Sequence, residues 1–82
     1  MSIQDERQAQ GHPAYDDGLR NAVRHAAEGT ETAVYWDGTA IYVRSVYAPK
    51  VPSASVVCIA QKWDEHTVQL RFASARSEWV KI

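Results

Sequence analysis

Residues 31–43, ETAVYWDGTAIYV, decide the fold, because here the apolar residues change from a helical period to alternation. Asp37-Gly38 lies in the middle of the stretch. Such a pair predicts a tight hairpin turn, since both central positions of a type I′ turn need positive φ. A two-residue loop at this pair sets Val34 opposite Ile41. The stretch therefore predicts two antiparallel strands joined by a short turn.

This hairpin carries bulky side chains on both faces, whereas a surface hairpin usually buries one face and exposes the other to solvent. Alternation assigns four apolar residues to one face: Val34, Trp36, Ile41 and Val43. The opposite face takes Ala33, Tyr35, Ala40, Tyr42, Arg44 and Val46. Tyr35 and Tyr42 lie diagonally across the predicted pair, within reach of aromatic contact.

Two further apolar runs, at residues 55–63 and 67–73, extend the sheet. In the second run, apolar residues alternate with polar ones, which is typical of a strand with one buried face. Residues 48–54, APKVPSA, form a connection before these strands, because two prolines cannot donate to a β-ladder. The sequence thus predicts a second hairpin after the first.

The loop near residues 64–66 decides which side chains of the second hairpin share a face. An even loop sets Ile59 opposite Leu70, whereas a three-residue loop would set Ile59 opposite Arg71. Because a slip of one residue turns every side chain over, we expect an even loop.

A helix is predicted over residues 13–28, before the first hairpin. Pro13 suits the first helical position, where its missing N–H costs nothing, and Gly29 suits the residue that follows a helix. The apolar residues follow spacings of three and four. The helical face is thin, and its bulky members are Tyr15, Leu19 and Val23.

Residues 1–11 are polar apart from Met1, Ile3 and a small alanine, and lack the apolar core of a signal peptide. We expect a flexible N-terminal tail there, followed by a single domain over residues 12–82, because unanchored termini stay mobile. The alternative is a segment that orders on a partner.

The fold class that follows is α+β: one N-terminal helix, then an antiparallel sheet of four to five strands in two sequential hairpins. Residues 78–82 are the predicted fifth strand, and a helical turn capped by Ser77 is the alternative. The expected core is Val34, Trp36, Ile41, Val43, Val57, Ile59, Val68, Leu70 and Phe72. The second face takes Tyr35, Tyr42, Val46, Val56, Cys58 and Ala60, with Arg44 and Arg71 among them.

One thin helix can cover only one of these two faces, and three arrangements remain open. The sheet curls around its large residues and the helix closes it. Alternatively, the alanines of the helix pack on the small residues Ala33, Ala40, Cys58 and Ala60. In the third arrangement, the second face meets another chain.

Composition narrows the class of protein. The chain has 82 residues, 45% of them hydrophobic, and a formal net charge of -1, which is typical of one small folded domain and gives no general attraction to nucleic acid or an anionic membrane. Cys58, the single cysteine, cannot form an internal disulfide, so we expect a cytoplasmic protein. No apolar run approaches the length of a membrane span.

Residues typical of catalytic or metal sites are few. His12, His25 and His66 lack metal-site spacing, and such a site needs three or four converging ligands. Cys58 lies in the apolar run VVCIA, where we expect a small buried side chain with a raised pKa. The sequence therefore predicts no enzyme, no metal and no cofactor.

We interpret the chain as a non-enzymatic protein-binding module that docks through its tyrosine-bearing sheet face or an edge strand, onto another protein or a copy of itself. Adaptors, inhibitors and accessory factors, including those carried by phages and mobile elements, are often of this size. The expected contact residues are Tyr35, Tyr42, Arg44 and Arg71, with Arg20 and Arg24 on the helix as a second surface. The alternative is a single-stranded nucleic-acid binder that uses the same aromatic and arginine residues.

Overall fold

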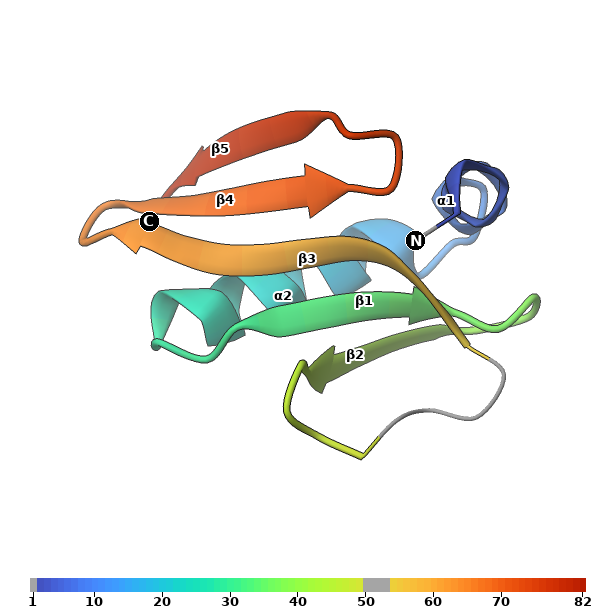
Figure 1. Ribbon diagram of the computed structural model, residues 1–82, viewed down its shortest axis with the longest axis horizontal. Helices are drawn as coiled ribbons and strands as arrows, with labels where there is room; N and C mark the ends of the chain where they lie inside the picture. Colours follow the sequence, from blue (N-terminus) through green and yellow to red (C-terminus); the bar gives the residue numbers. More distant parts are fainter. Residues whose placement is uncertain (1, 50–53) are drawn as a thin grey trace.

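The computed structural model describes residues 2–49 and 54–82, in which two helices pack on a five-stranded antiparallel sheet (Figure 1). The helices are α1 (Ile3–Gln10) and α2 (Tyr15–Ala27). The strands are β1 (Thr32–Trp36), β2 (Ile41–Ser45), β3 (Ser55–Asp64), β4 (Thr67–Phe72) and β5 (Ser77–Lys81), in the spatial order β2-β1-β3-β4-β5. The α+β prediction is confirmed, and the C-terminal segment is a strand. Residues 50–53 of the connection expected over 48–54 lie outside the described residues.

Helix α1 replaces the tail that the polar composition of residues 1–11 suggested. The hydroxyl of Ser2 caps the helix by accepting the Asp5 N–H at 3.2 Å. Ala9 is fully buried, and so is most of Glu6. The expectation was wrong for residues 3–10 because this segment is anchored by polar groups from remote parts of the chain, which a local pattern of apolar residues does not reveal.

Helix α2 begins at Tyr15, two residues later than Pro13. His12 accounts for the delay, because its Nδ1 accepts the Ala14 N–H at 3.0 Å and its carbonyl accepts the Tyr15 N–H at 3.0 Å. Gly29 follows the helix with φ of 101°, as predicted. The end of the helix is thus set by a glycine, and its start by a histidine turn.

The first hairpin reverses over a loop of four residues between Trp36 and Ile41. The Asp37 carboxylate accepts the backbone N–H groups of Thr39 and Ala40, each at 2.8 Å. Val34 therefore pairs with Val43, not with Ile41. The predicted register was wrong by two residues, but a shift of two leaves every side chain on its predicted face.

In the second hairpin the predicted even loop is confirmed, but the predicted faces of the side chains are wrong. Its turn, between Asp64 and Thr67, is even as expected. However, Trp63 is an extra residue in β3, because Lys62 pairs with Val68 and Asp64 with Thr67. This β-bulge moves the register by one, so Ile59 lies opposite Arg71.

The bulge corrects the predicted core. Cys58 and Ala60 pair with Phe72 and Leu70, and both face the helices, fully buried. Ile59 belongs to the other face and is only partly buried. The expectation that Ile59 lies in the core and that Cys58 and Ala60 lie on the second face is therefore wrong.

Both helices pack into one buried cluster on the same face of the sheet, and α2 is seen behind the sheet in Figure 1. The buried apolar cluster between the layers comprises Ala9, Tyr15, Ala22, Ala26, Val34, Trp36, Val57, Cys58, Ala60, Val68, Leu70 and Phe72. Small residues dominate where α2 crosses β3, since Ala22, Ala26, Cys58 and Ala60 are all fully buried. The packing of helix alanines on small residues of the sheet, one of the three arrangements left open, is therefore present. It occurs on the face that carries Val34 and Val68, not on the face that carries Tyr35 and Tyr42.

Candidate binding surface

The face of the sheet turned away from the helices, here the outer face, gathers side chains from all five strands. Its register rows follow from the strand pairing and the alternation of side chains. Its members include Ala33, Tyr35, Tyr42, Arg44, Val56, Ile59, Gln61, Trp63, Thr67, Gln69, Arg71, Ser77, Trp79 and Lys81. This face points toward the viewer in Figure 1, and no helix of the described residues covers it.

Tyr35 and Tyr42 are a direct cross-strand pair on this face, not the diagonal pair that was expected. The Tyr42 hydroxyl donates to Oδ2 of Asp37 at 2.7 Å. This hydrogen bond is the main cause that holds the pKa of Asp37 well below its usual range, and it raises the pKa of Tyr42. Both rings are half-buried, and the loop fixes that of Tyr42.

A single row of residues crosses the outer face from β2 to β4: Arg44, Ala33, Ile59 and Arg71. Ala33 is 1% exposed although no helix lies above it, because longer side chains flank it in the row. The spacing of strands separates the two arginines by about 14 Å. Arg71 is partly neutralised by Glu31, with Nη2 and Oε2 at 3.8 Å, while Arg44 is exposed.

Trp63 and Trp79 form a second aromatic pair, which the sequence did not predict as a site. Their ring centroids lie 4.8 Å apart and the planes meet at 76°, an edge-to-face arrangement. The two residues remain 63% and 52% exposed. The sequence signal was weak because Trp63 sits at the bulge, where alternation no longer assigns a side chain to a face.

The arginines of α2 lie on a separate surface. Arg20 Nη1 contacts Asp17 Oδ1 of the same helix at 2.7 Å. Arg20 and Arg24 are exposed, and α2 lies behind the sheet when the outer face is in view (Figure 1). The structure therefore brings Tyr35, Tyr42, Arg44 and Arg71 onto one face but not Arg20 and Arg24.

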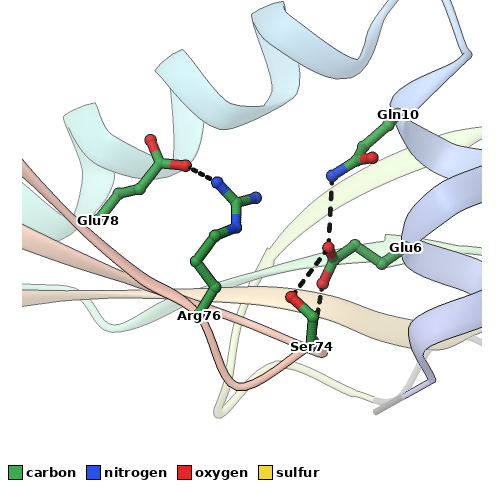
Figure 2. Close-up of polar contacts among 5 residues, drawn as sticks. All are labelled: Glu6, Gln10, Ser74, Arg76 and Glu78. Atoms are coloured by element: carbon green, nitrogen blue, oxygen red, sulfur yellow. Dashed lines mark hydrogen bonds and ion pairs between the residues drawn. The ribbon is translucent and has the colours of Figure 1, made fainter.

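On the helix side, a buried carboxylate joins α1 to the turn between β4 and β5 (Figure 2). Glu6 accepts the Ser74 backbone N–H at 2.9 Å and the Ser74 hydroxyl at 3.2 Å. Gln10 donates to the same carboxylate at 3.3 Å. Nearby, Arg76 pairs with Glu78 and lies 4.1 Å above the Phe72 ring. These hydrogen bonds connect α1 to the turn between β4 and β5, and the Glu6 carboxylate is already paired within the chain.

Cys58 lies fully buried beneath these elements, and burial raises the pKa of its thiol to about 12. The thiol is therefore protonated at neutral pH, and the thiolate that would act as a nucleophile is not formed. The sequence prediction of a small buried side chain with a raised pKa is confirmed.

A cavity of about 270 Å³ opens between the end of α2 and the start of β1. Its lining comprises His25, Thr30, Thr32, Val43, Arg44 and Ser45. The Thr32 hydroxyl donates to the Thr30 carbonyl at 2.7 Å, so this buried donor is already satisfied within the chain. The cavity adjoins β2 on the helix side and is separate from the two aromatic pairs.

No protein-family model, curated protein or solved structure matches the chain. Neither helix of the described part has the length and apolar character needed to cross a membrane. Within residues 2–49 and 54–82, no three side chains of the usual metal-binding types come together as a metal site.

Proposed function

We propose that this protein is a small, non-enzymatic protein-binding module of the cytoplasm, which docks its outer face onto another protein. One observation carries the proposal: both helices pack on the same side of the sheet, and the uncovered side presents two aromatic pairs. Tyrosine, tryptophan and arginine are the residues most enriched at the energetic centres of protein interfaces. The outer face combines all three.

The charges on the outer face favour a protein over a nucleic acid as the partner. Glu31 offsets Arg71, and the Asp37 carboxylate lies against the Tyr42 hydroxyl. A phosphate backbone would meet these acidic groups beside the aromatic rings, and the whole chain has a net charge of -1. A protein surface with charges of both signs fits this distribution better.

A test compares the proteins that co-purify with the wild-type chain and with the Tyr35→Ala/Tyr42→Ala variant in the native host. We expect the outer-face variant to lose partners that the wild type retains. Arg20→Ala/Arg24→Ala is the matched control, since it removes two exposed side chains from the helix side. It should retain the partners.

Two outcomes would overturn the proposal. Partners unchanged by the tyrosine variant, or lost only with the arginine control, would remove the outer face as the docking site. Co-purifying nucleic acid whose affinity falls steeply with salt would replace the protein partner with a single-stranded nucleic acid stacked on the same aromatic residues.

A further inference from the structure

The outer edge of β5 presents backbone groups that no strand of the described chain pairs. Two hydrogen bonds show which backbone groups of this segment point toward β4. The Ile82 N–H donates to the His66 carbonyl, and the Phe72 N–H donates to the Arg76 carbonyl, each at 2.9 Å. Even-numbered residues of this segment therefore direct their backbone groups toward β4. Ser77, Trp79 and Lys81 direct theirs away from the sheet, along the upper edge in Figure 1.

Large apolar side chains gather at the same edge. Trp79 is 52% exposed and Ile82 45%, and Trp63 lies against Trp79. Val80, on the helix side of β5, is only partly buried. A strand placed beside β5 would thus gain backbone hydrogen bonds and cover apolar surface at the same time.

We propose that β5 pairs antiparallel with β5 of a second copy of this chain, so that the two sheets become one. A twofold axis perpendicular to the sheet keeps the helices of both copies on one side and the outer faces on the other. The inference goes beyond the proposed function and does not depend on it, because it uses the backbone edge and not the tyrosine pair.

Several registers of this strand pair would bring the outward backbone groups of the two copies together. The side chains of β5 favour one of these registers. Centring the pair on Glu78 sets two carboxylates opposite each other, which is unfavourable. Centring it on Trp79 sets Glu78 opposite the apolar Val80 and Lys81 opposite Ser77 of the other copy, so neither charged group meets a complementary partner.

Centring the pair on Val80 also leaves Glu78 opposite an apolar residue, Ile82, but it gives Lys81 a complementary partner. Val80 then meets its own copy on the helix side. Lys81 lies opposite Trp79 of the second copy on the outer face, twice by symmetry, where an ammonium group beside an indole ring is favourable. In this register the hydrogen-bonded pairs join Trp79 to Lys81.

The test measures the mass of the full chain by sedimentation over a range of concentrations. We expect the wild type to move from 9.2 kDa toward twice that mass as the concentration rises. Lys81→Pro removes an outward N–H in each copy and leaves the bonds to β4 in place. It should weaken the dimer by roughly tenfold or more.

Ser77→Pro is the matched control, because it removes another outward N–H of the same strand and no residue of β5 (Ser77–Lys81) lies opposite Ser77 in the register centred on Val80. It should leave the dimer affinity unchanged, and far-ultraviolet circular dichroism should show both variants folded. A wild type that stays monomeric up to about 1 mM would overturn the proposal.

Two other results would also overturn it. Equal weakening by Ser77→Pro would exclude the register centred on Val80. A dimer that Tyr35→Ala/Tyr42→Ala abolishes while Lys81→Pro does not would place the contact on the outer face. Failure of the docking function leaves these masses unchanged, so the two proposals fail separately.

Discussion

Glu6 accepts a hydrogen bond from the backbone N–H of Ser74, 68 positions away in the chain, at 2.9 Å. This contact explains why a polar segment near the N-terminus forms a helix in the fold. An isolated helix of this length is unstable in water, so its stability must come from tertiary contacts. Glu6 supplies one such contact at the turn between β4 and β5 (Figure 2).

Replacing Glu6 by alanine should lower the free energy of unfolding by about 1–3 kcal/mol, because the Ser74 N–H loses its partner in a partly buried site. Urea denaturation measures the change. Gln4→Ala, at an exposed position of the same helix, should change stability by less than about 0.5 kcal/mol. Equal stability of the Glu6 variant and the wild type would show that α1 is held by other contacts.

Gly18→Ala should destabilise the protein although alanine favours a helix. A Cβ atom at Gly18 would lie 2.9 Å from Cγ2 of Ile41, on the strand beneath α2. We expect a loss of about 1–3 kcal/mol from this overpacking. Gly11→Ala is the control, since its Cβ would meet no atom closer than 3.5 Å. If thermal unfolding showed that Gly18→Ala is more stable than the wild type, this result would contradict the close approach of α2 to β2.

The contact between Asp37 and Tyr42 predicts a pH dependence at both ends of the range. The pKa of Asp37 is lowered in the fold, so its contribution to stability is present above the usual aspartate value and is lost as the pH falls toward the lower folded value. The pKa of Tyr42 is raised, so its contribution is present below the usual tyrosine value and is lost as the pH rises through the folded value.

Nuclear magnetic resonance titration of the Tyr42 ring checks this coupling. In the wild type the ring should titrate above the usual tyrosine pKa, and Asp37→Asn should bring it back toward that value. The same substitution should remove part of the acid-induced loss of stability. A Tyr42 titration that Asp37→Asn leaves unchanged would mean that the hydrogen bond does not persist in solution.

Cys58 should resist thiol reagents in the native protein. Its side chain is fully buried and burial raises the pKa of the thiol to about 12, so at pH 8 almost no thiolate is present. Labelling should accelerate with urea in step with unfolding. Rapid labelling without denaturant would show that the cover formed by the helices opens in the native state.

The sequence predicted the faces of the first hairpin even though its register was wrong. The loop after Trp36 is longer than the two residues of Asp37-Gly38, and the resulting shift was an even one. Tyr35, Tyr42 and Arg44 therefore lie together as expected. Alternation along a strand is robust to this kind of error.

The second hairpin could not be predicted by the same reasoning. Trp63 adds one residue to β3, and no composition rule marks a bulge in advance. Cys58 and Ala60 consequently face the helices, and the pair of Trp63 and Trp79 was missed. Helix α1 was missed for a different reason, because Ser74 stabilises it from the far end of the chain.

The three tryptophans offer a direct test of whether the outer face docks onto a protein. Trp63 and Trp79 are exposed on that face, whereas Trp36 is buried on the helix side and donates its indole N–H to Gln8 at 3.2 Å. When a partner captured from the host is added to the ¹⁵N-labelled chain, the indole signals of Trp63 and Trp79 should shift and that of Trp36 should not. A shift of the Trp36 signal alone would place the contact on the helices and contradict docking through the outer face.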